Sequence, residues 1–274
     1  MAIGQAREQG ADLIIAVDPD ADRCALAVPD PTSETGWSPL SGDQIGSLLG
    51  EFLAARGMTG SLANSIVSSR LLSRIARAHG LEHHTTLTGF KWIGDQIHRL
   101  ETENEAERFI FGFEESYGYL AGSYVRDKDA VVASMLICEM AAYYRSIGSS
   151  IKARLEEIYA SYGHYLNAVD SFEFPGLSGM EKMGGIMEAL RKNPPKELAG
   201  YAVTTVTDFE NSESTGLPRA NILVFALENG ESVIVRPSGT EPKIKTYFTT
   251  KGQGMEEAKQ EKEKLAAAMK PLLA

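Results

Sequence analysis

Asp18-Pro19-Asp20-Ala21-Asp22-Arg23 follows the apolar run Leu13-Ile14-Ile15-Ala16-Val17 near the start of this chain. The apolar run predicts a buried strand, and the acidic hexapeptide then forms a loop at the carboxyl end of that strand. In open α/β sheets the crevice beyond the strand ends is where ligands bind. The position of the loop therefore favours a binding site.

The carboxylates of Asp18, Asp20 and Asp22 stand at alternate positions, and their mutual repulsion requires a cation or a strong basic partner to neutralise it. Oxygen-only ligands are those that Mg²⁺ and similar hard divalent ions prefer. Arg23 follows directly, and its guanidinium suits a phosphate group beside such an ion.

Three other interpretations compete for an alternating acidic loop. An EF-hand loop needs Gly at its sixth position and Glu at its twelfth, and it is rejected because those positions hold Arg23 and Pro29. An aspartyl-phosphate phosphatase would use the first carboxylate, Asp18, as its nucleophile. A solvated acidic turn with Pro19 as the turn former is the third interpretation. The last two stay open on the motif alone.

The composition is that of an ordinary globular protein. With 274 residues, 43% of them hydrophobic, the chain is long enough for about two domains and part of a third. Its 27 basic and 37 acidic residues, net charge −10, argue against nucleic acid or an anionic membrane as the principal partner. Any anionic ligand must then be bound by local basic residues.

The sequence predicts a cytoplasmic protein. Cys24 and Cys138 are the only cysteines, and their apolar neighbours predict buried thiols in a reducing compartment. Residues 1–10 lack the basic and hydrophobic regions of a secretory signal. The longest apolar stretch, Ala130 to Ala142, is interrupted by Glu139 and is too short to span a bilayer.

The expected fold class is α/β, in three segments. Residues 1–40, with a helix over Ala2 to Gln9 that Gly10 stops, are interpreted as the C-terminal part of another α/β domain, which carries the acidic loop. Pro29 to Pro39 is predicted to be a turn or linker.

Residues 41–162 are expected to form a layered mixed α/β sheet domain, because helical and strand patterns alternate. Asp43 is predicted to cap its first helix, and Met135, Met140 and Tyr143 are expected in the core. Its inward helix positions are predicted to include Ile45, Leu48, Leu49, Phe52, Ile93, Ile97 and Leu100. Helices are predicted over Leu71 to Ala78, from Thr88-Gly89 and over Ala130 to Tyr144, and strands over Ser65 to Ser68, Leu81 to Leu87 and Phe109 to Phe111.

Residues 163–274 are expected to form a smaller C-terminal α+β domain, because runs of strands lie between helical patterns. Predicted strands lie near Phe172 to Phe174, Tyr201 to Thr205, Ile222 to Leu227 and Ser232 to Val235, with a last helix from Met255. Met180, Met183, Met187 and Leu190 recur at helical spacing and are interpreted as packing residues.

Gly112-Phe113-Glu114-Glu115-Ser116-Tyr117-Gly118-Tyr119 is the second stretch with chemical potential. Flanking glycines permit a tight loop, adjacent carboxylates can accept hydrogen bonds from vicinal hydroxyls, and Ser116 can donate and accept. The combination suits a sugar ring, which Tyr117 and Tyr119 could enclose. A surface hairpin containing Glu and Tyr would look the same.

Two further basic features indicate anions. Lys91 lies in the first turn of a predicted helix, where a cation opposes the helix dipole, although a lone surface lysine fits equally well. Arg236-Pro237-Ser238-Gly239-Thr240-Glu241-Pro242-Lys243 is a turn between two prolines that can present successive backbone N–H groups as an anion nest, with charge from Arg236 and Lys243. The second feature predicts a phosphate site.

Taken in order, these loops resemble those of the α-D-phosphohexomutases, in the phosphoglucomutase branch that carries Gly-Phe-Glu-Glu-Ser-Tyr-Gly. The stretch from Asp18 to Arg23 is similar to the Mg²⁺ loop of that family, and Thr88-Gly89-Phe90-Lys91 to a loop of its third domain. The stretch from Arg236 to Lys243 is similar to its distal phosphate loop, and the resemblance covers essentially the whole chain.

The resemblance implies phosphoryl transfer from a phosphoserine to a hexose monophosphate, through glucose 1,6-bisphosphate as activator and intermediate. It implies Mg²⁺ on the three aspartates, sugar hydroxyls on Glu114 and Ser116, and catalytic assistance from Arg23 and Lys91 near the reacting phosphate. The residues implied for the non-reacting phosphate are Arg236, Ser238, Gly239, Thr240 and Lys243.

One departure from the family pattern changes the expectation for activity. The phosphoserine of the family lies in a Thr-Ala-Ser-His-Asn-Pro loop, and no Ser-His dipeptide occurs in this chain. The chain is therefore expected to be the C-terminal part of a mutase, inactive alone, whose partner is the missing N-terminal part. A phosphomannomutase, a phosphopentomutase, a non-catalytic sugar-phosphate-binding module and the phosphatase remain alternatives.

Overall fold

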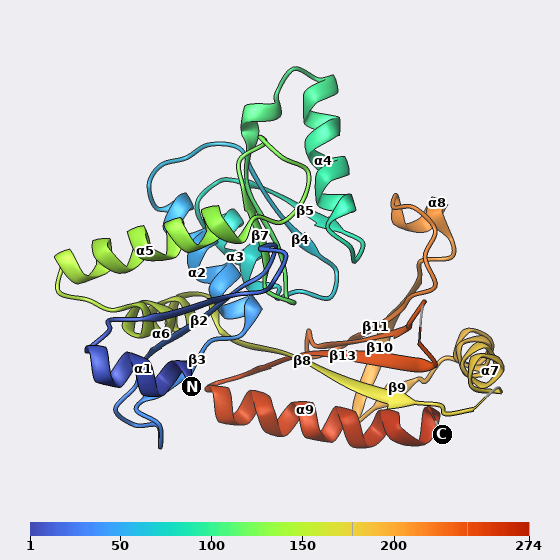
Figure 1. Cartoon of the computed structure of the whole chain (residues 1–274). Coiled ribbons are helices and arrows are strands. Elements are labelled where there is room, and N and C mark those ends of the chain that lie inside the picture. The colour runs from blue at the N-terminus through green and yellow to red at the C-terminus, as the bar shows by residue number, and fades with distance from the viewer. Residues whose placement is uncertain (177, 240, 274) are drawn as a thin grey trace. The chain divides into compact units, whose positions relative to one another are not determined.

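The computed structural model describes residues 1–176, 178–239 and 241–273. The chain forms two compact units, Met1–Tyr162 and Gly163–Ala274, which are described separately below (Figure 1). Both combine helices and sheets, so the chain has the mixed α/β architecture that the sequence predicts.

The first unit begins with α1 (Ala2–Gln9), which ends at Gly10 in the left-handed conformation, φ 61°. A three-stranded antiparallel sheet follows, formed by β1 (Ile14–Val17), β2 (Cys24–Pro29) and β3 (Trp37–Pro39). The prediction of a buried first strand is wrong, because β1 lies at the edge of this sheet and Val17 is 45% exposed. The segment expected as a linker contains β3.

A four-stranded sheet in the order β5-β4-β6-β7 forms the centre of this unit. Strands β4 (Ser61–Ser65), β5 (Glu82–Thr86) and β6 (Phe109–Glu114) are parallel, and β7 (Gly118–Ala121) pairs antiparallel to β6. The strand predicted over Ser65 to Ser68 is misplaced. Residues 61–65 show no alternation because every one of them is buried, as is usual between parallel neighbours.

Helices cover both faces of this sheet. A Cβ at Gly46 of α2 (Gly42–Ala54) would meet the ring of Phe113, and a Cβ at Gly112 would meet Ile93 of α4 (Lys91–Thr102), so β6 is packed from both sides. This explains its continuous apolar run. The unit is completed by α3 (Leu71–Ala78), the 3-10 turn Ala106–Arg108, α5 (Ala130–Ser146) and α6 (Ile151–Tyr162).

Several details of the helices differ from expectation. Ser41, not Asp43, caps α2, in a reciprocal capping box with Gln44, while the carboxylate of Asp43 accepts the N–H of Ser69 at 2.6 Å. On α5, Met140 is buried as predicted, but Met135 is 64% exposed. Tyr143, Cys138 and, in the second unit, Met180 are also exposed against prediction, whereas Cys24 is buried.

The second unit is a six-stranded antiparallel sheet in the order β8-β13-β12-β11-β10-β9. Buried residues of α7 (Gly179–Lys192) and α9 (Met255–Met269) join those of the central strands in one apolar core. The strands are β8 (His164–Glu173), β9 (Glu197–Leu198), β10 (Tyr201–Asp208), β11 (Leu223–Leu227), β12 (Ser232–Pro237) and β13 (Lys243–Gly252), and the short helices are α8 (Ser212–Thr215) and the 3-10 turn Lys270–Leu272.

Among the described residues, no single helix is long and apolar enough to cross a membrane, and the pair α5 and α6, which together have the length and composition, is bent by 88°.

Candidate active site

The acidic stretch forms the turn of the hairpin between β1 and β2, and it brings its three aspartates together. One carboxylate oxygen from each of Asp18, Asp20 and Asp22 lies within 4.8 Å of the other two. Oδ1 of Asp18 accepts the N–H groups of Asp22 at 3.1 Å and Arg23 at 2.9 Å. The N–H of Arg23 also lowers the pKa of Asp18 below its ordinary value. The turn therefore orients charged carboxylates toward one point.

The donor set fits a hard divalent ion. Oδ1 of Asp22 is shielded from solvent and accepts no hydrogen bond from the described residues. A shielded carboxylate oxygen is costly unless a cation compensates it, and Arg23 Nε approaches it only to 3.5 Å. Three carboxylates in reach of one another match the oxygen ligands of Mg²⁺. The residues present could therefore hold that ion.

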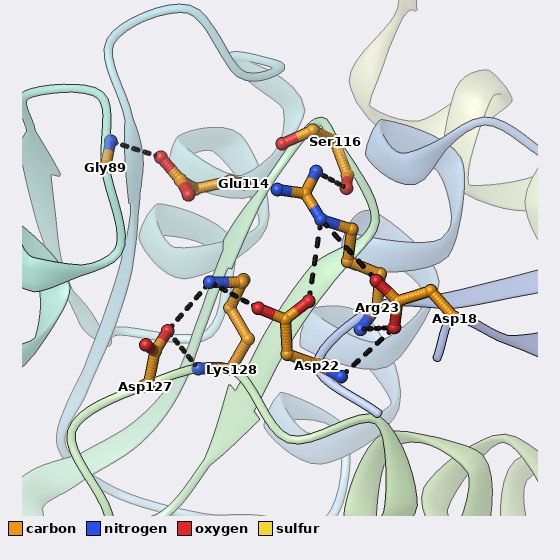
Figure 2. Close-up of polar contacts among 8 residues, drawn as sticks. All are labelled: Asp18, Asp22, Arg23, Gly89, Glu114, Ser116, Asp127 and Lys128. Atoms are coloured by element: carbon orange, nitrogen blue, oxygen red, sulfur yellow. Dashed lines mark hydrogen bonds and ion pairs between the residues drawn. The ribbon is translucent and has the colours of Figure 1, made fainter. Parts of the chain in front are cut away.

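Arg23 joins the acidic turn to the loop between β6 and β7 (Figure 2). Its Nη1 donates to the carbonyl oxygen of Ser116 at 3.0 Å, and its Nε lies 3.9 Å from Oδ2 of Asp18. The next residue continues the link, because the N–H of Cys24 donates to the carbonyl of Tyr117 at 3.0 Å. Two segments that are 93 residues apart in sequence thus form one hydrogen-bonded structure.

The second predicted site stretch forms the end of β6, a tight turn and the start of β7. Gly112 lies inside β6 and not in the loop, and the left-handed position of the turn is Tyr117, with φ 68°. The two adjacent carboxylates do not act together. Oε2 of Glu115 accepts hydrogen bonds from the hydroxyls of Ser65 and Ser68, at 3.3 and 3.1 Å.

Glu114 is directed to the other helix layer. Its Oε1 accepts the N–H of Gly89, just before α4, at 2.6 Å (Figure 2). Burial raises the pKa of Glu114 above its ordinary value, against the hydrogen bond from Gly89 and the charges of Lys128 and Arg23. The hydroxyl of Ser116 makes no hydrogen bond within the described part of the chain. These two side chains therefore offer a carboxylate and a hydroxyl beside the acidic turn.

Lys91 begins α4, two residues after the Gly89 that Glu114 binds. Its ammonium lies 5.0 Å from the ring centre of Trp92, and it forms no ion pair with residues 1–176. The structure therefore places Lys91 at the start of α4, two residues from the Gly89 that Glu114 binds, and does not bring it into contact with Arg23 or the aspartates.

Lys128 is a site residue that the sequence did not reveal. Its Nζ lies 3.0 Å from Oδ2 of Asp22 and 2.8 Å from Oδ1 of Asp127 (Figure 2). Its side chain is only 12% exposed, and a Cβ at Gly118 would lie 2.3 Å from its Cδ, so this glycine provides the space for the lysine. The next residue, Asp129, caps α5 by accepting the N–H groups of Val131 and Val132.

The loop from Arg236 to Lys243 lies in the second unit, between β12 and β13. The predicted nest is wrong for three of its N–H groups, which already donate hydrogen bonds to other atoms of the loop and so are not free for an anion. They belong to Ser238, Glu241 and Lys243. Nζ of Lys243 pairs with Glu241 at 2.5 Å, and Arg236 is half-buried in β12 opposite Lys245. Gly239 is exposed, and Thr240 lies outside the described residues. Anion binding here would rest on side-chain charge.

The chain is similar to known proteins of one family. Residues 41–162 match the family model for phosphoglucomutase/phosphomannomutase alpha/beta/alpha domain III, and residues 186–268 match that for the C-terminal domain. The chain is 39% identical over 261 residues to a protein of Haemophilus influenzae named "Probable phosphomannomutase", and 36% identical over 274 residues to a phosphoglucomutase of Staphylococcus aureus. Each alignment covers 94% of this chain but 50% and 48% of the relatives, so the chain spans about half their length.

Solved structures share the fold. The open form of parafusin, a phosphoglucomutase from Paramecium, aligns with a TM-score of 0.70 at 19% identity, covering 96% of this chain and 44% of that one. A phosphoglucomutase/phosphomannomutase family protein from Burkholderia thailandensis aligns with a TM-score of 0.67 at 14% identity, covering 98% and 49%. At these identities the likeness shows the fold alone.

Proposed function

We propose that this chain, which belongs to the α-D-phosphohexomutase superfamily, is the C-terminal part of a phosphoglucomutase. In this proposal it serves the interconversion of glucose 1-phosphate and glucose 6-phosphate by Mg²⁺-dependent phosphoryl transfer. The phosphoserine comes from a part of the protein that these 274 residues do not contain. Glucose 1,6-bisphosphate is the proposed intermediate, and the cytoplasm the proposed location.

The observation that carries the proposal is the junction of the acidic turn with the β6–β7 loop. A cluster of three aspartates alone is common on protein surfaces. Here Arg23 contacts the carboxylates of the cluster and the backbone of Ser116, so the proposed metal ligands and the proposed sugar-binding loop lie side by side. Such a junction suits a substrate that carries both a phosphate and hydroxyl groups.

Each residue then has a defined task. Asp18, Asp20 and Asp22 would hold Mg²⁺, which neutralises charge on the phosphoryl group in transfer. Arg23 is positioned to bind a phosphate oxygen beside them. The carboxylate of Glu114 would accept hydrogen bonds from sugar hydroxyls, and the hydroxyl of Ser116 would both donate to them and accept from them. Lys91, at the start of α4, adds a positive charge two residues from the Gly89 that Glu114 binds.

The proposed residues for the non-reacting phosphate belong to the second unit. Arg236 and Lys243 provide charge there, and the main-chain N–H of Gly239 and the hydroxyls of Ser238 and Thr240 complete the proposed set. In this proposal these groups bind the phosphate that does not react.

Substrate preference is a finer part of the proposal, because the two curated relatives named above carry different names. Glucose phosphate is proposed on the strength of the Gly-Phe-Glu-Glu-Ser-Tyr-Gly loop, with mannose and pentose phosphates as alternatives. A non-catalytic sugar-phosphate-binding module is the alternative outside enzymes. It is favoured only because the Ser-His dipeptide of the family's phosphoserine loop does not occur in this sequence.

A coupled dehydrogenase assay tests the proposal. We expect the 274-residue chain with Mg²⁺ and glucose 1,6-bisphosphate to show no mutase activity above background, and addition of the N-terminal part of a relative to restore it. Neither Ser116 nor Ser238 is the serine phosphorylated in the family pattern, and the Ser-His dipeptide of that pattern does not occur in this sequence.

Three outcomes would contradict this. Turnover by the chain alone that Ser116→Ala or Ser238→Ala abolishes would place the nucleophile within it. Phosphate release that Asp18→Asn abolishes would favour the phosphatase. Failure of any N-terminal part to restore activity, with sugar-phosphate binding intact, would favour the binding module.

A further inference from the structure

The ammonium of Lys128 forms an ion pair with Asp22, a proposed metal ligand. It lies 3.0 Å from Oδ2 of Asp22, while Oδ1 of the same carboxylate has no hydrogen bond from the described residues. A divalent ion and an ammonium that share one carboxylate repel each other and compete for its charge. Metal binding should therefore weaken the contact between Lys128 and Asp22.

The chain offers the ammonium a second partner at almost no displacement. Oδ1 of Asp127 lies 2.8 Å from the same Nζ and accepts the backbone N–H of Lys128 at 2.8 Å. Asp127 is 69% exposed and is one residue from the lysine, whereas Asp22 belongs to another segment. The lysine can thus leave Asp22 and stay paired.

The surroundings leave Lys128 few other positions. Its side chain is 12% exposed, its stem runs over Gly118 where a Cβ would collide at 2.3 Å, and its ammonium lies 5.5 Å from the ring centre of Phe90. A cation confined in this way has a fixed position in the site, unlike the ammonium of a mobile surface lysine.

We propose that Lys128 is a positioning residue of the metal site, a resident counter-cation that neutralises Asp22 when no ion is bound and moves fully to Asp127 when a divalent ion binds. The inference rests on the proposed function, because it takes the three aspartates as the metal ligands. It adds that metal affinity is set by an exchange between two carboxylates, only one of which is a ligand.

Mn²⁺ binding to the whole chain, measured by electron paramagnetic resonance of free Mn²⁺, tests the exchange without any activity assay. Lys128→Met should tighten the Kd about tenfold, because the competing charge is removed. Lys152→Met is the matched control, since Lys152 pairs with Asp30, which is no metal ligand, at 2.5 Å. It should leave the Kd within about twofold of the unmodified chain.

A double-mutant cycle separates the exchange from general electrostatics. Asp127→Asn should weaken Mn²⁺ binding about fivefold in the unmodified chain, because Lys128 then stays on Asp22, but by less than about twofold when Lys128→Met is already present. An equal loss in both backgrounds would show plain charge attraction and would overturn the proposal. Circular dichroism melts identify any variant that fails to fold, and Lys128→Gln then repeats the test with a different neutral side chain.

The two proposals fail in different ways. If the chain binds Mn²⁺ and Asp20→Asn abolishes binding, but Lys128→Met leaves the Kd unchanged or weakens it, the exchange is wrong and the metal site stands. If Asp20→Asn has no effect on Mn²⁺ binding, the metal assignment itself fails, and the exchange fails with it.

Discussion

Replacing Gly42 by alanine should disturb the β6–β7 loop, which lies far from Gly42 in sequence but in direct contact with it. Gly42 is the first residue of α2, and a Cβ there would lie 2.0 Å from the carbonyl oxygen of Glu115 and 2.9 Å from the backbone nitrogen of Tyr117. These are backbone atoms, so no rotamer change relieves the collision. Reaching ordinary contact at 3.4 Å requires the loop to move by about 1.4 Å.

The magnitude follows from what the movement breaks. The hydrogen bonds from Arg23 to Ser116 and from Cys24 to Tyr117 are both 3.0 Å long and would exceed hydrogen-bonding distance. Their loss costs about 0.5 to 1.5 kcal/mol each, and the overpacking adds about 1 to 3 kcal/mol. We therefore expect the free energy of unfolding of the first unit to fall by about 3 kcal/mol, with weaker sugar-phosphate binding.

Urea denaturation followed by tryptophan fluorescence measures this loss in the relevant unit, because both tryptophans, Trp37 and Trp92, lie within residues 1–162. Gly4→Ala is the control. A Cβ at Gly4, in α1, would have no atom within 4 Å, so alanine should stabilise the helix by up to about 1 kcal/mol. A loss below about 0.5 kcal/mol for Gly42→Ala would refute the packing argument.

Three further outcomes are expected. The ion pair with Lys152 and the hydrogen bonds from Thr32 lower the pKa of Asp30 to about 2, so its stabilisation, present above about pH 4, should fade as the pH falls toward 2. Urea titrations across that range should show this fading, and Asp30→Asn should remove it. Arg236→Ala should weaken calorimetric binding of glucose 6-phosphate about tenfold, whereas Lys259→Ala on α9 should leave it unchanged; equal losses would count against the loop. Ser41→Ala should lower the free energy of unfolding by about 1 kcal/mol through loss of the α2 cap, and an unchanged urea midpoint would argue against that cap.

Local sequence patterns predict those elements whose buried face follows from the periodicity of their own apolar residues. The stripe of Ile93, Ile97 and Leu100 faces the sheet as expected, and each of the three is buried. Residues 61–65 carry no such pattern, because a strand between two parallel neighbours is buried on both faces whatever its polarity. The sequence therefore predicts a strand at Ser65 to Ser68, where the chain already turns.

Exposure and long-range contacts could not be predicted in the same way. Met135 and Cys138 have apolar neighbours in sequence, yet both are exposed, since burial depends on which other element packs against that face of α5. Lys128, just before α5, contacts Asp22, just before β2. No spacing rule connects two residues so far apart in sequence. The acidic turn was visible because its three ligand candidates lie within five residues of one another.

The hydrogen bonds between the acidic turn and the β6–β7 loop also bear on how this site can move. Beyond the Arg23 and Cys24 links, the N–H of Ala130 donates to the carbonyl of Ala21 at 3.1 Å, which attaches the start of α5 to the same turn. Any opening that separated the acidic turn from both the β6–β7 loop and the start of α5 would break all of these bonds at once. The amide protons of Cys24 and Ala130 should therefore exchange with solvent at one common, slow rate, and the two loops should move as a single rigid body.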